Sequence, residues 1–160
     1  MDNLLNSDAT TALILLGILI VSYGILRSIF FPAVKKLANR TSTFIDDLFL
    51  DKKFLNRLSY VIVFIIFNIL TATPEFSIDL FSNVIVSRLI DAAFALLVGL
   101  TILEVLSVFN KISEKIDVLK DRPIKGYIQI LKIIISAFVV IIIFAIVTGQ
   151  SVAYYISGLG

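Results

Sequence analysis

The chain of 160 residues contains no cysteine and no histidine, and both absences narrow its chemistry. Without cysteine it has no disulfide and no thiolate nucleophile, and without histidine it has no imidazole base. The commonest zinc ligands are missing for the same reason. Asp, Glu, Lys and Tyr remain, but this set is so thin that we expect neither an enzyme nor a cofactor.

Charge is also scarce, because 16% of the residues are charged while 59% are hydrophobic. The net charge of +2 gives no reason to expect nucleic acid as a partner. The mean hydropathy of +1.03 is far above that of a soluble domain of this length. We therefore expect one membrane domain over residues 1–160, with lipids as its first partners.

The stretch from Ile133 to Ile156 contains no formal charge. About 20 helical residues cross a bilayer core, whereas buried strands usually run about 4–8 residues. This stretch therefore predicts a membrane helix, which Gly149 and Gln150 end. Hydropathy along the chain predicts an all-α membrane protein with four transmembrane helices, over residues 11–31, 58–73, 84–109 and 126–148.

Two charged connectors, residues 32–57 and 110–125, join these spans, and the basic residues gather around them. Seven of the 14 Lys and Arg residues fall in 27–57 and five fall in 111–125. Basic loops stay in the cytoplasm. The sequence therefore predicts two cytoplasmic connectors and places both termini outside.

The first connector contains a predicted helix cap formed by Thr43, Asp46 and Asp47. A threonine oxygen at the start of a helix can accept a hydrogen bond from the third backbone N–H, while a carboxylate at that third position accepts one from the backbone N–H of the threonine. Adjacent carboxylates can also bind a metal or transfer protons, but they need partners that converge from elsewhere. Capping is the favoured role.

Besides Arg27 near the end of the first span, four charged residues fall inside the predicted spans. Arg88 and Asp91 are three residues apart, so they can form an intrahelical pair near the outer end of the third span. Glu104 and Lys132 lie about 9 and 10 Å from the inner ends of two consecutive antiparallel spans. We expect an interhelical ion pair between them; the alternative is that each side chain extends separately to the headgroups.

Gly17 and Gly24 are seven residues apart and so lie on nearly one face of the first span. Small residues in membrane helices allow close contact between helices. Glycine is also common in membrane helices that make no such contact. Both roles remain open at the sequence level.

Several segments resemble one family. The connector segment RTSTFIDDLFL resembles the Thr-x-Thr-x-x-Asp-Asp-Leu pattern of small-conductance mechanosensitive channels. The closing segments RPIKGYIQILKI, GQS and ISGLG are similar to the miniconductance-type branch, which has five transmembrane helices. The resemblance implies a bacterial inner-membrane protein with an outside N-terminus and four sensor helices. A Gly/Ala-rich fifth helix then lines the pore of a homo-oligomer, a heptamer in this family.

The resemblance also implies roles near the end of the chain. It assigns a linker to residues 149–156, beginning with Gly149 and Gln150, and the first turn of the pore helix to Ser157, Gly158, Leu159 and Gly160. The family's cytoplasmic β-domain would follow this turn. We therefore expect a membrane-tension-sensing module involved in osmotic response, lacking most of the pore helix and the cytoplasmic domain. One alternative is a stand-alone four-helix assembly or regulatory protein without conduction. A small transporter that uses the charges in the spans is the least favoured.

Overall fold

A computed structural model describes residues 2–38, 51–76, 78, 81, 83–113 and 124–158. These ranges contain helices and no strand, which confirms the all-α prediction for the part of the chain described. In chain order the elements are α1 (Asp2–Ile25), a π-helical segment η1 (Leu26–Phe30), α2 (Phe31–Ala38), α4 (Lys52–Thr71), a 3₁₀ turn η2 (Pro74–Phe76), α6 (Val84–Ser113), α8 (Ile124–Thr148) and α9 (Val152–Ser157).

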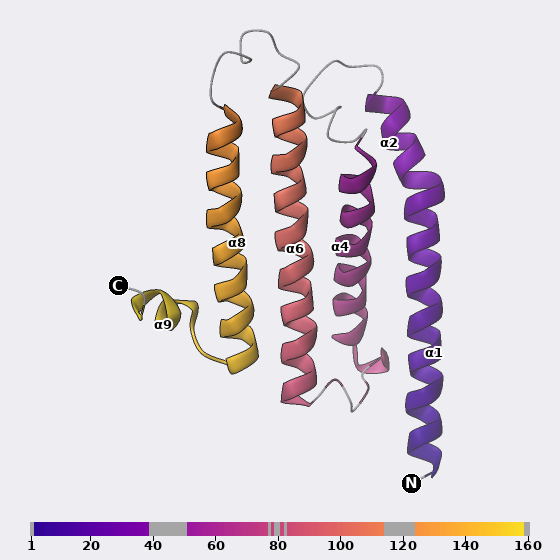
Figure 1. The fold of residues 1–160 in the computed structure, drawn as a ribbon. Helices are drawn as coiled ribbons and strands as arrows, with labels where there is room; N and C mark the ends of the chain where they lie inside the picture. Colours follow the sequence, from indigo (N-terminus) through magenta and orange to yellow (C-terminus); the bar gives the residue numbers. More distant parts are fainter. Residues whose placement is uncertain are drawn as a thin grey trace.

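Four long helices lie side by side in the order of the sequence (Figure 1). Helix α1 packs on α4, α4 on α6, and α6 on α8, so α1 and α8 form opposite edges of a row. Within the described ranges, four segments are long and apolar enough to cross a membrane: Ala9–Val34, Lys52–Thr71, Val84–Ser113 and Lys125–Thr148. The prediction of four membrane-spanning helices is confirmed at this level.

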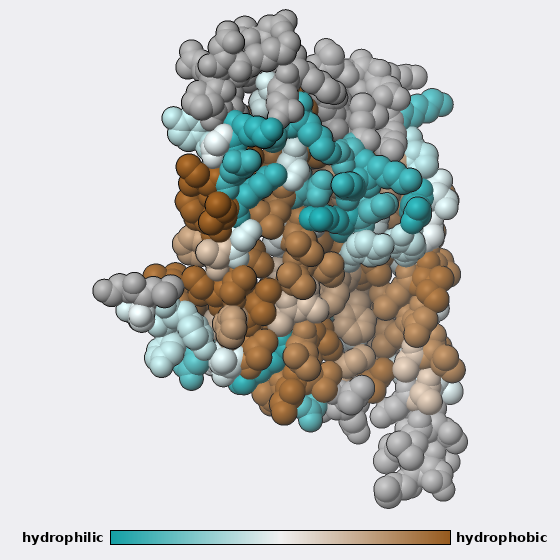
Figure 2. Space-filling model, viewed as in Figure 1, coloured by the Kyte–Doolittle hydropathy of each residue, from teal (hydrophilic) through white to brown (hydrophobic). Residues whose placement is uncertain are grey.

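The two ends of the row differ in what they carry. We call the end with Ala38, Lys52, Ser113 and Ile124 the connector end; the start of α1 and the end of α8 lie at the opposite end (Figure 1). Figure 2 shows hydrophobic residues forming a band across the spans and hydrophilic residues gathering toward the connector end. This separation is what a membrane span with one polar border requires.

The first helix extends past the boundary expected from the sequence, because it continues through Pro32 to Ala38. A proline ring inside a helix collides with the carbonyl four residues earlier, here that of Ser28. The helix widens into the π-helical segment just before this point, and the Phe31 N–H donates to the Leu26 carbonyl five residues back. Local π geometry thus accommodates Pro32 without ending the helix.

The most buried apolar side chains lie at the connector end. Phe31 of α2, Phe54 and Leu55 of α4 and Val108 of α6 form one cluster. Many large apolar residues elsewhere in the spans are exposed, among them Leu13 and Ile133. In water such a surface would aggregate, whereas in a bilayer lipid tails cover it. The packing therefore agrees with a membrane environment.

Glycine brings α6 and α8 into close contact at one position. A Cβ added to Gly99 of α6 would lie 2.6 and 2.7 Å from the two γ-carbons of Val139 in α8. By contrast, nothing lies within 4 Å of a Cβ added at Gly17 or Gly24. Of the two roles left open for these glycines, close helix contact is therefore absent within the described chain.

Candidate functional site

Asp51 joins the start of α4 to the end of α6. Its Oδ1 accepts hydrogen bonds from the backbone N–H groups of Lys53 (2.9 Å) and Phe54 (3.1 Å), so it is the N-cap of α4. Its Oδ2 accepts from the Lys111 ammonium at 2.7 Å. One carboxylate therefore both caps a helix and makes a salt bridge between two helices.

The cap predicted at Thr43, Asp46 and Asp47 lies outside the described residues. The cap at Asp51 was not predicted from the sequence, although the residue carries a usable signal. An aspartate that directly precedes an apolar helical stretch is a preferred N-cap residue. The charged residues after it led us to begin the second span at residue 58, whereas the helix begins at Lys52.

The pKa of the Asp51 carboxyl lies below its ordinary value. Partial burial raises the pKa, but the hydrogen bonds from Lys111 and from the backbone of Phe54 and Lys53 lower it by more. A carboxyl whose pKa is lowered by folding stabilises the protein above its unfolded pKa, about 4. That stabilisation is lost as the pH falls through the lower, folded pKa.

We expect Asp51→Ala to lower the free energy of unfolding by about 1 kcal/mol at pH 7, because α4 loses its cap. Between pH 7 and pH 3 the difference from the unchanged protein should shrink, and detergent-denaturation curves across this range measure it. Ser151→Ala is the matched control, since Ser151 caps α9 without a titrating group. A cost for Asp51→Ala that is as independent of pH as the control's would contradict this assignment.

Arg57 and Glu104 form a second connection between α4 and α6. The Arg57 guanidinium lies 3.4 Å from a Glu104 carboxylate oxygen and also donates to the Leu100 carbonyl. The Glu104 side chain is 9% exposed and that of Arg57 is 35% exposed. Burying a carboxylate without a partner is costly, and Arg57 lies close enough to pair with it.

Lys132 of α8 has a different partner from the one we predicted. Its ammonium donates to the Ser107 hydroxyl of α6 at 2.9 Å, while that hydroxyl donates to the Leu103 carbonyl. The structure therefore does not bring Glu104 and Lys132 together. Glu104 pairs with Arg57 of α4, whereas Lys132 bonds to Ser107, which lies three residues after Glu104 on α6. The prediction matched the two charges by their depth along the spans, but the direction in which each side chain points from its own helix also decides its partner.

We call these three contacts the polar seam: Asp51 with Lys111, Arg57 with Glu104, and Ser107 with Lys132. The seam links α4, α6 and α8 in the half of the row nearer the connectors. Helix α1 adds a contact in the same half, since Tyr23 stacks on Tyr60 with ring centres 5.8 Å apart.

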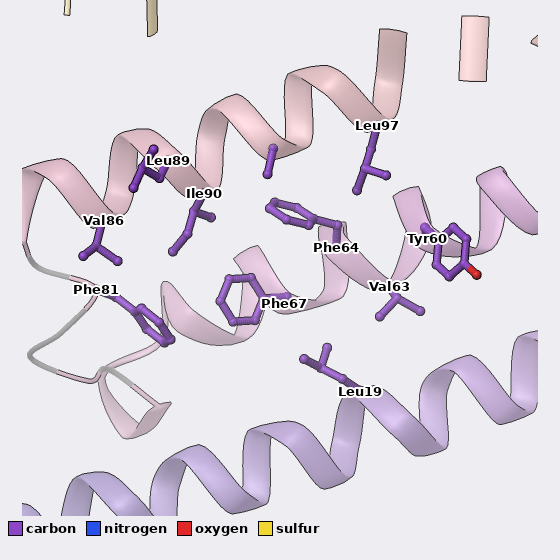
Figure 3. A pocket seen from close by; sticks show the side chains of 11 residues that line it. Leu19, Tyr60, Val63, Phe64, Phe67, Phe81, Val86, Leu89, Ile90 and Leu97 are labelled. Carbon is purple, nitrogen blue, oxygen red and sulfur yellow. The ribbon is translucent and has the colours of Figure 1, made fainter. Parts of the chain in front are cut away.

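An apolar groove of about 700 Å³ lies between α1, α4 and α6 and extends from Tyr60 toward the end opposite the connectors (Figure 3). Phe64 stacks on Phe94 with ring centres 5.1 Å apart, and Phe67 meets Phe81 edge-on at 5.4 Å. The groove is lined by Leu19, Tyr60, Val63, Phe64, Phe67, Phe81, Val86, Leu89, Ile90, Ala93 and Leu97. It offers no acid, base or cation to a bound molecule.

The predicted pair of Arg88 and Asp91 is not formed in the described part of the chain. The Arg88 guanidinium instead lies against the turn that follows α8, where it fills the space that a Cβ on Gly149 would need. Gly149 has φ +71, a left-handed conformation that glycine adopts freely. Its N–H donates to the Ile146 carbonyl (3.2 Å) and the next N–H, of Gln150, donates to that of Ala145 (3.0 Å). These bonds form a Schellman motif at the end of α8.

The linker that we expected from Gly149 to Ile156 is a turn followed by helix α9. Ser151 caps α9 by accepting from the Tyr154 N–H at 3.2 Å. The hydroxyls of Tyr155 and Thr148 lie 2.8 Å apart, which ties α9 to the end of α8. Ser157 is the last residue of α9 and Gly158 caps it, while residues 159 and 160 lie outside the described ranges.

Within the described ranges no group of three acidic side chains converges to hold a metal ion. No family model matches this chain, and neither a curated protein nor a solved structure does. The described helices form a row in which the ion pairs between helices lie toward the connector end and an apolar groove lies toward the other end.

Proposed function

We propose that this chain is the tension-sensing membrane module of a mechanosensitive channel in a bacterial inner membrane, where it takes part in the osmotic response. One observation carries the proposal: the helices form an open row that the polar seam ties together at the connector end. Away from that end, an apolar groove lies between α1, α4 and α6.

Membrane tension does work on a protein in proportion to the change in its area within the membrane. A state with a larger area is favoured as tension rises, and helix tilt is a natural way to reach it. Apolar contacts between helices are replaced by lipid contacts at little cost, because lipid tails are as apolar as leucine. Polar contacts are not replaced in this way. The row should therefore open from the end opposite the connectors.

The sequence resemblance described above supports the same function. It assigns four sensor helices to such channels, followed by a helix that lines the pore. In this proposal the turn at Gly149 and helix α9 pass the motion of α8 to that pore helix. The partners would be membrane lipids and further copies of the chain, arranged as a heptamer by resemblance.

We expect both connectors to face the cytoplasm, as the basic residues indicate. Single cysteines placed at Gln150 and at Lys125 test this, because the natural chain has no cysteine to label. In intact cells an impermeant maleimide should label position 150 but not position 125, and both should react after lysis. Labelling of only position 125 in intact cells would reverse the orientation.

The pattern of opening can be tested with two pairs of nitroxide labels across α4 and α8. Lys53 and Lys125 form a pair at the connector end, while Ile69 and Val147 form a pair at the opposite end; all four side chains are exposed. Pulsed electron resonance then gives both distances in thick and in thin bilayers. We expect the second distance to increase in thin bilayers while the first stays constant. Equal changes in both, or none in either, would argue against the proposal.

An assembly protein without conduction is the second candidate. The flanks of α1 and α8 favour it, because among the described helices α1 packs mainly on α4 and α8 mainly on α6. A partner's helices could cover those flanks. A purely structural role predicts distances that do not respond to bilayer thickness.

A further inference from the structure

Arg88 is the one basic residue among those described that lies in the half of the row away from the connectors. It extends from α6 to the turn after α8. Both of its terminal nitrogens and its Cζ are the nearest atoms to the place where a Cβ on Gly149 would stand. The contact therefore depends on the glycine, since any other residue at position 149 would push the guanidinium out.

The end of α8 is an attractive place for a cation. The last carbonyls of a helix carry a partial negative charge that its own hydrogen bonds do not neutralise. Two of these carbonyls, those of Ala145 and Ile146, accept hydrogen bonds from backbone N–H groups of the turn. The guanidinium of Arg88 sits beside this turn and so meets the negative end of the helix.

Asp91 is a second acceptor within reach of the same cation. It lies three residues after Arg88 on α6, a spacing at which side chains on a helix surface meet. Its side chain is exposed, and it makes no ion pair or hydrogen bond with any described residue. An unpaired carboxylate within a membrane span is unfavourable. The structure thus holds one cation and two alternative partners.

We propose that Arg88 exchanges between the turn at Gly149 and the carboxylate of Asp91. While the turn lies against α6, Arg88 is docked on it and Asp91 is unpaired. When the turn moves away, Arg88 pairs with Asp91, which stabilises the displaced state. The exchange makes the position of α9 relative to α6 a two-state property, the kind of bistable element on which switches depend. It does not depend on the proposed tension sensing.

Two nitroxide labels, at Ile85 of α6 and Ile156 of α9, report on the two states. Both side chains are exposed, at 69% and 46%. With the chain in lipid nanodiscs, we expect one dominant distance, and Gly149→Ala should populate a longer one. Adding Asp91→Asn to Gly149→Ala should then reduce the longer population on the order of fivefold, because the displaced Arg88 has lost its second partner. Asp91→Asn alone should leave the distances unchanged.

Gly158→Ala is the matched glycine control. A Cβ there meets only two carbonyl oxygens of α9 at ordinary distances of 3.6 and 3.8 Å, so the distances should not change. Gly149→Asn separates space from strain, since asparagine tolerates a positive φ yet still carries a Cβ. Gly149→Asn should also populate the longer distance, and it replaces Gly149→Ala in the test if that variant does not fold.

Arg88→Gln completes the set. Without the cation, Asp91→Asn should have no effect on the distances in any background. The proposal is overturned if neither substitution at Gly149 lengthens the distance. It is equally overturned if Asp91→Asn has the same effect with and without the substitution at Gly149, because Asp91 is then not the second partner.

Discussion

Replacing Arg57 with methionine should lower the free energy of unfolding by about 2–3 kcal/mol. Removing one partner of a fully buried ion pair typically costs about 3–5 kcal/mol, since the other charge stays buried alone. Here Glu104 is nearly buried but Arg57 is about a third exposed, so we expect a smaller loss. Methionine keeps much of the apolar length of the arginine, which limits the effect of lost packing. Titration with a denaturing detergent measures the change.

A double-mutant cycle identifies the partner of Glu104. Arg57→Met and Glu104→Gln together should cost less than the sum of their separate effects, by about 1–2 kcal/mol. The cycle of Glu104→Gln with Lys132→Met is the matched control. It should be additive within about 0.5 kcal/mol, because Lys132 binds Ser107 instead. A large coupling in the control cycle, with additivity in the first, would show that the polar seam is assigned incorrectly.

Gly99→Ala should lower the free energy of unfolding by about 1–3 kcal/mol, the usual cost of overpacking. The added carbon would collide with both γ-carbons of Val139. Valine has essentially one allowed rotamer in a helix, so it cannot turn away, and α6 and α8 must separate. Unfolding in detergent measures the loss.

Val139→Ala should restore part of that loss by making room for the new carbon, so the double substitution should be less destabilising than the sum. Gly17→Ala is the matched control, because nothing lies within 4 Å of its added carbon. It should be neutral or stabilise the protein by up to about 1 kcal/mol through its helix propensity. Equal losses at positions 17 and 99 would mean that α6 and α8 are not in close contact.

The four spans could be predicted from the sequence because length and apolarity alone decide whether a helix can cross a bilayer. The residues at which the helices begin and end were harder to predict, because the prediction used only length and apolarity. Hydropathy reports which residues suit lipid, whereas Asp51 begins α4 by capping it. The first span was expected to end at residue 31, but local π geometry lets the helix continue through Pro32.

The partners of the charged residues could not be predicted, because they depend on how each helix is rotated about its axis. An amphipathic pattern fixes that rotation. Helix α6 is apolar around most of its circumference, so its sequence does not say that Glu104 faces α4 while Ser107 reaches α8. The contact between Arg88 and Gly149 joins residues far apart in the chain, and the nearby Asp91 offered the more obvious local partner.

The response of the row to tension itself tests the central claim most directly. A donor and an acceptor dye on Leu16 of α1 and Val140 of α8 report the width of the row, and both side chains are exposed. With the chain in giant vesicles held by a micropipette, energy transfer should fall reversibly as tension rises. A second pair on Leu96 of α6 and Val140 should not respond, because those two helices are in close contact. A row whose width stays constant up to vesicle rupture would contradict the account.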